Sequence, residues 1–183
     1  FVSMEEANRF LDAKEITAPR VALGTALCIV SPIPLIFLGA VSSKLLINGN
    51  DKLGRGVYTF STLATNSFYD VKLDTVYGPA EYHLNGTCPC RCEKCYATRG
   101  RYVFDTVKNA NARKTIISRN DIDWMVAAIT AQIKAEHIRI CRIHASGDFD
   151  SMEYIAAWRS IVAECSDTIF WTYTKNAVAE NAF

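Results

Sequence analysis

The chain has 183 residues and a formal net charge of +1, and half of its residues are hydrophobic. This length allows one sizeable domain with an appendage but hardly two full domains. The near-neutral charge lacks the basic surplus that usually marks a nucleic-acid-binding domain. Its seven cysteines are an odd number, so they cannot all pair within the chain.

The first 43 residues differ in character from the rest of the chain. Residues 3–16 are predicted to form a short amphipathic helix, because Ser3 and Glu6 have the spacing of a capping box. The run from Val21 to Ser43 contains no charged residue. An apolar run longer than about 18 residues can cross a bilayer as a helix. We therefore expect residues 1–43 to be a membrane anchor that ends in a transmembrane helix, and the protein to be located at a membrane.

Residues 44–183 are predicted to form a single mixed domain. Residues 48–87 are rich in Gly, Asn, Asp and Tyr, which indicates loops and small strands such as Val57–Phe60. The later residues alternate between helix and strand patterns, with helix at 121–136, strand at 138–145, a helix that begins at Asp150 or Ser151, and strand at 168–174. This alternation predicts an α/β fold with a parallel sheet.

Four of the cysteines, Cys88, Cys90, Cys92 and Cys95, lie within eight residues. Thiolates are soft ligands that select zinc, Cu(I) or iron–sulfur clusters. A structural zinc site commonly takes two ligand pairs from separate segments, whereas one continuous loop can wrap an iron–sulfur cluster. The loop therefore predicts a thiolate metal site that favours an iron–sulfur cluster, with zinc as the alternative.

Cys88, Cys92 and Cys95 have the spacing C-x3-C-x2-C, which resembles the signature of the radical SAM enzymes. The resemblance implies that these three cysteines bind three irons of a [4Fe–4S] cluster, while the fourth iron chelates S-adenosylmethionine (SAM). The sequence departs from the signature at Lys94, where those enzymes usually carry an aromatic residue. Cys90 is an additional thiol that could fill the open iron position.

Ser146, Gly147 and Asp148 follow the strand predicted at 138–145. In open α/β sheets, ligands bind at the carboxyl ends of the strands. These three residues are a loose analogue of the Gly-Gly-Glu-Pro segment that holds the SAM amino group in radical SAM proteins, which implies a cofactor-binding role. The alternative is a helix cap in which an aspartate accepts backbone N–H bonds. His144, on the same strand end, is by type more often a hydrogen-bonded core residue than a ligand.

Two further groups of polar residues lie near these motifs. Residues 172–176 end the last predicted strand and would face the same rim of the sheet. Arg99, Arg101, Tyr96 and Tyr102 form a basic-aromatic patch beside the cysteines, which could hold an anionic substrate or nucleic acid. The alternative for this patch is a solvated turn.

Taken together, the motifs resemble the gene-product-88 family of phages and mobile elements. The resemblance covers roughly residues 44–176 and is carried by the stretches 88–102, 142–149 and 170–175. The order of the motifs is similar to that of a radical SAM half-barrel, which implies a partial βα-repeat. Residues 1–43 instead resemble a bacterial membrane-protein segment, as in a fusion. Because cluster thiols survive best in a reducing compartment, we expect residues 44–183 to lie in the cytoplasm.

Overall fold

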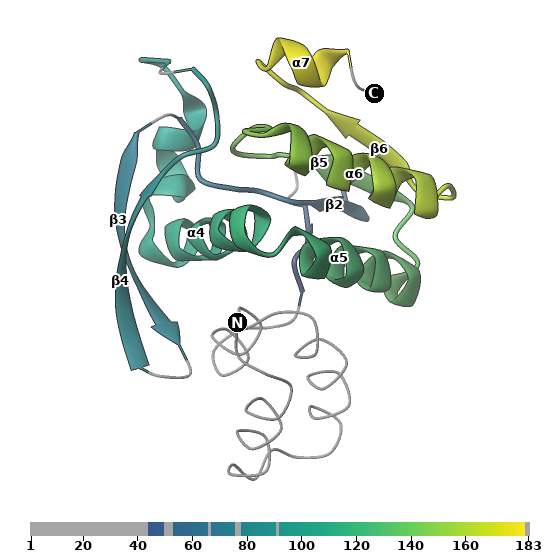
Figure 1. Cartoon of the computed structure of the whole chain (residues 1–183), viewed down its shortest axis with the longest axis horizontal. Helices are drawn as coiled ribbons and strands as arrows, with labels where there is room; N and C mark the ends of the chain where they lie inside the picture. The colour runs from purple at the N-terminus through teal and green to yellow at the C-terminus, as the bar shows by residue number, and fades with distance from the viewer. Residues whose placement is uncertain (1–43, 50–52, 66, 76–77, 91, 182–183) are drawn as a thin grey trace, which may run out of the picture.

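The computed structural model describes residues 44–49, 53–65, 67–75, 78–90 and 92–181 (Figure 1). These residues form a mixed α/β fold with a four-stranded sheet, a separate two-stranded sheet and four α-helices. The strands are β1 (Ile47–Asn48), β2 (Val57–Thr59), β3 (Phe68–Thr75), β4 (Gly78–Asn85), β5 (Ile140–Ile143) and β6 (Ile169–Thr172). The α-helices are α4 (Asp105–Asn120), α5 (Ile122–Glu136), α6 (Met152–Glu164) and α7 (Ala177–Glu180), and two short 3-10 helices cover Tyr96–Thr98 and Gly100–Val103.

The larger sheet has the order β1-β2-β5-β6, in which β1 runs antiparallel and the other three strands run parallel. The parallel strands β2, β5 and β6 are neighbours in the order in which the chain makes them. Tyr58 of β2 pairs with Cys141 of β5, which pairs with Phe170 of β6. The predicted parallel sheet is therefore confirmed, and the carboxyl ends of its three parallel strands meet at one edge.

Helices α5 and α6 begin where the sequence predicts. The Asp121 carboxylate accepts a bond from Trp124 N at 3.3 Å at the start of α5, and Ser151 Oγ accepts one from Tyr154 N at 3.1 Å at the start of α6. Helix α4 was not predicted, because many of its buried residues are polar and hide the apolar period: Asn111, Lys114, Thr115 and Ser118.

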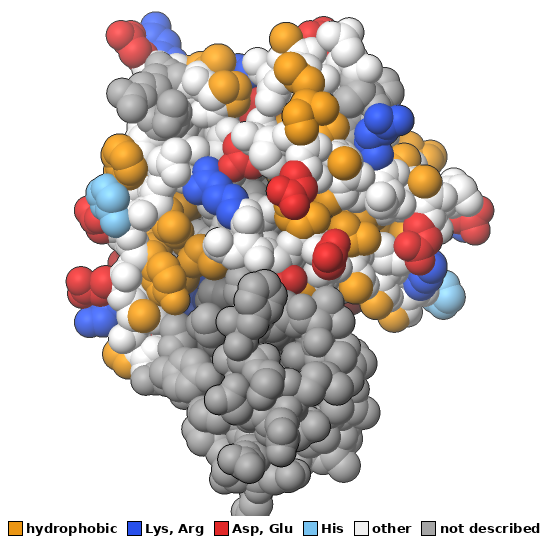
Figure 2. All heavy atoms as spheres, in the orientation of Figure 1, with side chains coloured by type: hydrophobic (Ala, Val, Ile, Leu, Met, Phe, Trp, Pro, Cys, Tyr) orange, Lys and Arg blue, Asp and Glu red, His pale blue; other side chains and the backbone are white. Residues whose placement is uncertain are grey.

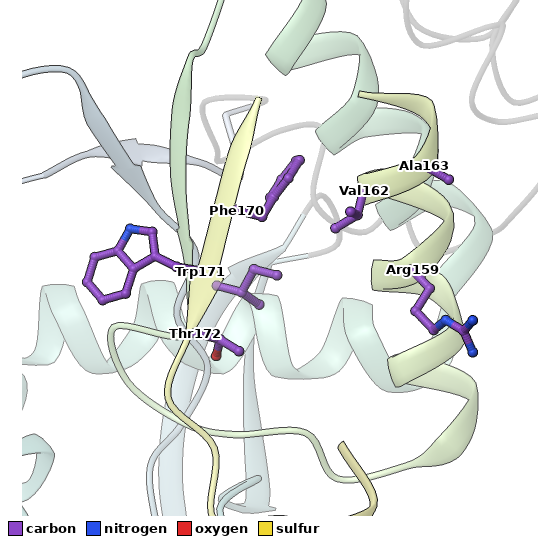
Figure 3. Close-up of a pocket in the computed structure, with 7 residues that line it drawn as sticks. Arg159, Val162, Ala163, Phe170, Trp171 and Thr172 are labelled. Carbon is purple, nitrogen blue, oxygen red and sulfur yellow. The ribbon is translucent and has the colours of Figure 1, made fainter. Parts of the chain in front are cut away.

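The three long helices lie together on one side of the sheet, where the hydrophobic core forms (Figure 1). In the core Phe60, directly after β2, makes an edge contact with Trp158 of α6 at 5.4 Å between ring centroids. Figure 3 shows Phe170 of β6 pointing toward α6 and Trp171 pointing the opposite way. An apolar groove of about 540 Å³ lies between β6 and α6. Seen from the view of Figure 1, charged side chains of both signs are scattered over the surface (Figure 2).

The hairpin of β3 and β4 is longer than the small strands expected at residues 48–87. Its strands pair antiparallel along their full length, from Phe68 opposite Asn85 to Thr75 opposite Gly78. Val71 and Leu73 are buried in the core, and Asn109 Nδ2 of α4 donates to the Lys72 carbonyl at 3.1 Å. The hairpin therefore packs on α4 and delivers the chain to the start of the cysteine loop.

The predicted membrane location requires correction. No helix among the described residues is long and apolar enough to cross a membrane. The run Val21–Ser43, on which that prediction depended, lies outside the described residues, as does the helix predicted at residues 3–16. For the residues that it describes, the structure therefore supports a mixed α/β fold and gives no support to a transmembrane helix.

Candidate functional site

The cysteine loop, residues 88–95, begins at a point that is fixed to the ends of two parallel strands. Thr87, directly before it, donates from N and Oγ1 to the Leu63 carbonyl, at 3.0 and 3.1 Å. Thr87 Oγ1 also accepts from Asp148 N at 2.9 Å and lies 2.9 Å from Thr62 Oγ1. Thr62 and Leu63 follow β2 and Asp148 follows β5, so Cys88 starts from the carboxyl edge of the sheet.

The far end of the loop is tied to the same edge by two tyrosines. The hydroxyls of Tyr96 and Tyr102 both donate to the Ala145 carbonyl, at 2.7 and 3.1 Å. A carbonyl oxygen has two lone pairs and can accept both bonds. Because Ala145 lies just beyond β5, the cysteine loop is held against the end of the central parallel strand at both of its ends.

The middle of the loop is contacted from the end of β6. Lys175 Nζ lies 2.7 Å from Cys92 Sγ, and this contact with the thiol raises the pKa of Lys175. The backbone of Lys175 is held in turn by Asp148, whose Oδ2 accepts from Lys175 N at 2.7 Å. Residues from all three parallel strand ends therefore converge on the loop, as expected for residues 172–176.

Ser146, Gly147 and Asp148 form the turn after β5 that contacts Thr87 at the start of the cysteine loop, and the side chains of Ser146 and Asp148 are engaged within the protein. Ser146 Oγ donates to the Thr62 carbonyl at 3.0 Å. The Asp148 carboxylate is only 2% exposed and accepts from three donors: Phe149 N at 2.8 Å, Thr174 Oγ1 at 2.6 Å and Lys175 N at 2.7 Å. A carboxylate with three short bonds clamps the ends of β5 and β6 together.

Gly147 allows the turn after β5 to approach Thr62 and Thr87 closely. Its φ is +84°, a conformation that L side chains rarely adopt. A Cβ at this position would stand 1.9 Å from Thr62 Oγ1 and 2.7 Å from Thr87 Oγ1. Only glycine lets the turn after β5 pass beneath the two threonines that fix the start of the cysteine loop.

The four loop thiols lie at one edge of the sheet but do not converge on a point. All four are partly exposed and free of disulfides. Burial raises the pKa of the Cys88 thiol, and the nearby Asp148 carboxylate adds to the rise. Among the described residues, no three His, Cys, Asp or Glu side chains are close enough together to hold a metal ion. The structure therefore places the predicted ligands at one edge of the sheet, but it does not gather them into one coordination shell.

A hollow of about 420 Å³ borders Cys88 on the side of the hairpin. Its charged lining is an ion pair between Arg119 of α4 and Asp150, with Nε to Oδ2 at 2.8 Å. Arg119 also donates to the Asn85 carbonyl at 2.9 Å. Sequence reasoning missed Arg119, because it belongs to the helix that shows no clear apolar period.

His144 belongs to the core. Its φ is +62°, its Nε2 lies 2.9 Å from the Tyr154 hydroxyl, and burial lowers its pKa from 6.5 to about 3. A neutral imidazole packed among aromatic rings has no route to a ligand at the cysteine loop. The more ordinary of the two interpretations of this residue is thus confirmed.

Comparison with known proteins identifies the family. The family model described as Gene product 88 matches residues 44–181. The chain belongs to the Gene product 88 family. Gene 88 proteins of Mycobacterium phages D29 and L5 are each 29% identical to it over 94 residues, an alignment that covers 46% of this chain and 39% of each relative. The chain thus matches less than half the length of these curated relatives, and no solved structure matches it significantly.

Proposed function

We propose that this Gene product 88 protein binds a [4Fe–4S] cluster through Cys88, Cys92 and Cys95 and acts as a radical SAM-like protein. The observation that carries the proposal is the attachment of the cysteine loop to the carboxyl edge of three parallel strands. In α/β folds with parallel sheets, this edge is where ligands bind and chemistry takes place.

The order of the strands supports the same proposal. Strands β2, β5 and β6 are parallel neighbours in chain order, with the long helices on one side, as in part of a βα barrel. The cysteine loop follows the first of these strands, and Ser146–Asp148 follow the second. This sequence of parts is half-barrel-like and agrees with the motif order of radical SAM proteins.

The residues of the loop fit a cluster by their chemistry. The thiols are free, partly exposed and on one continuous segment, and thiolates are the usual protein ligands of iron–sulfur clusters. When bound, a cluster with three protein ligands supplies an open iron for SAM and an electron to cleave its sulfonium. Metal binding is often coupled to ordering of the ligand segment, so we propose that the loop gathers its thiols on binding. Lys175 then offers its ammonium to Cys92.

The hollow beside Cys88 is the proposed position of SAM. It is large enough for part of a small molecule, and Arg119 and Asp150 in its lining would exchange their ion pair with each other for the carboxylate and amino groups of a methionine. Asp148 does not line this hollow, and its carboxylate is already occupied by three donors. We therefore assign Ser146, Gly147 and Asp148 to positioning: this turn fixes the start of the cysteine loop through Thr87 and holds Lys175 against the loop.

Anaerobic reconstitution with iron and sulfide tests the proposal. The full chain should gain a broad absorption near ~400 nm, the charge-transfer band of thiolate-bound clusters. Alanine at position 88, 92 or 95 should each abolish the band, whereas Cys90→Ala should keep it. Cys141→Ala is the matched control, because Cys141 is buried in β5 and does not belong to the loop.

The response to SAM tests the open iron. In the reduced, reconstituted protein, SAM should change the electron paramagnetic resonance spectrum, because the open iron gains a ligand. If Cys90→Ala loses the band as fully as the other loop variants, the site has four thiolate ligands and the radical SAM proposal fails. Stoichiometric zinc without iron uptake would instead indicate a non-catalytic zinc module that binds a protein or nucleic acid partner.

A further inference from the structure

The side of the sheet opposite the helices carries a cation in contact with two aromatic rings. Arg142 of β5 pairs in register with Trp171 of β6, so their side chains lie next to each other on one face. Figure 3 shows Trp171 pointing away from α6 and its groove. Tyr173, two residues further along, packs edge-on against Trp171 with ring centroids 5.5 Å apart. We call Arg142, Trp171 and Tyr173 the aromatic-arginine cluster.

The Arg142 guanidinium contacts two rings, and none of the described residues forms a hydrogen bond with its side chain. Its central carbon lies 5.0 Å from the Trp171 ring centroid and 5.5 Å from that of Tyr173. Among the described residues it forms no ion pair, and its buried Nε has no hydrogen-bond partner. Stacking fixes the plane of a guanidinium while leaving its N–H donors available. The two terminal nitrogens of the guanidinium form no hydrogen bond with the described residues and are not among the buried unpaired atoms, so they are the donors exposed to an external anion.

We propose that the aromatic-arginine cluster binds a nucleoside monophosphate, with the phosphate on Arg142 and the base stacked on the tyrosine ring. A guanidinium presents a fork of donors that matches the oxygens of a phosphate. Tyr173 is 72% exposed and offers ring surface to a planar base. One cation for the phosphate and one aromatic ring for the base match the two parts of a single nucleotide.

The charge of the chain distinguishes this ligand from a nucleic acid strand. A protein that tracks a phosphate backbone needs several cations in a row, and this chain has a net charge of only +1. The cluster also lies close to the cysteine loop, because Arg142 is three residues before Ala145, whose carbonyl accepts the bonds from Tyr96 and Tyr102. Nucleotide binding here does not require the metal site, so the two proposals can be tested separately.

Calorimetric titration of the full chain with AMP, GMP, CMP and UMP in turn tests the inference. At least one nucleotide should bind with a dissociation constant below about 1 mM. Arg142→Gln should weaken that binding about tenfold or more, since a charged hydrogen-bond donor is lost. Arg159→Gln removes the same charge from α6, on the opposite face, and should bind as the wild type does (Figure 3). Cys88→Ala should also bind the nucleotide as the wild type does, which distinguishes nucleotide binding from the proposed iron–sulfur site.

Tyr173→Ala provides a second test in case Arg142→Gln does not fold, because it removes an exposed ring without disturbing the core. It should weaken binding several-fold while its circular dichroism spectrum stays that of the wild type. The inference is overturned if no nucleotide binds the wild type, or if either Arg142→Gln or Tyr173→Ala binds as the wild type does. It is equally overturned if inorganic phosphate binds as tightly as the nucleotide, or if an oligonucleotide binds more tightly per nucleotide than the monomer.

Discussion

Lys114 offers a quantitative test of how the core of this fold is built. It lies on α4 with only 5% of its surface exposed, and its Nζ is 5.5 Å from the centroid of the Phe60 ring. Burial lowers its pKa from 10.5 to about 8. We predict that Lys114→Met, which keeps the apolar length of the side chain and removes the charge, stabilises the protein at pH 7.

The size and sign of the effect follow from the pKa. At pH 7 the lysine is protonated in both states, so the cost of burying its charge is fully present. Lowering this pKa from 10.5 to about 8 corresponds to about 3 kcal/mol, because each factor of ten in proton affinity is worth about 1.36 kcal/mol. The cation–π contact with Phe60 is worth about 1 kcal/mol in the other direction. The variant should therefore gain about 2 kcal/mol in free energy of unfolding.

The pH dependence has a defined direction. Between pH 8 and 10.5 the unfolded state binds more protons than the folded state, so the stability of the wild type should rise with pH in this window. The advantage of Lys114→Met should shrink accordingly. Urea unfolding of the wild type and of Lys114→Met at pH 7 and pH 9.5 measures both stabilities and their pH dependence. Lys72 is exposed, so Lys72→Met is the control and should stay within about 0.5 kcal/mol of the wild type. A less stable variant at pH 7, or an advantage that does not change with pH, would refute the reasoning.

Three other substitutions have expected outcomes. Gly147→Ala should destabilise the protein by about 2 kcal/mol or more in thermal unfolding, because its Cβ would overlap Thr62 Oγ1; an unchanged midpoint would mean that the turn is adaptable. Burial lowers the pKa of His144 to about 3, so the stability that its neutral form contributes above pH 6.5 should be lost as the pH falls. His144→Asn should make the free energy of unfolding less dependent on pH between pH 6.5 and 4, as measured by denaturant titrations. Asp148→Asn should cost about 1–3 kcal/mol in thermal unfolding, because the carboxylate that accepts from Lys175 N and two other donors is lost, whereas a wild-type midpoint would argue against the clamp.

The regular apolar patterns predicted the C-terminal part of the fold well. Helices α5 and α6 and strands β5 and β6 have clear periods and local caps, and the structure confirms them. Helix α4 and the long hairpin could not be predicted in this way. Helix α4 buries polar side chains such as Thr115, whose Oγ1 accepts from Leu63 N at 2.9 Å, and such long-range bonds leave no periodic trace in a sequence.

The candidate site shows a similar division. The cysteine spacing and the strand-end residues could be predicted, because thiols in one loop and the carboxyl ends of parallel strands are local features. The clamp by Asp148 and the open Arg142 face depend on which strands are neighbours. Arg142 looks like an ordinary strand residue until β6 brings Trp171 and Tyr173 beside it.

The central claim is that the cysteine loop holds an iron–sulfur cluster, and metal analysis of anaerobically purified full chain tests it most directly. The account predicts about four iron and about four acid-labile sulfide per chain, with little zinc. The same analysis of Cys92→Ala should show both lost, while Cys141→Ala keeps them. One zinc per chain with neither iron nor sulfide, before and after reconstitution, would contradict the account.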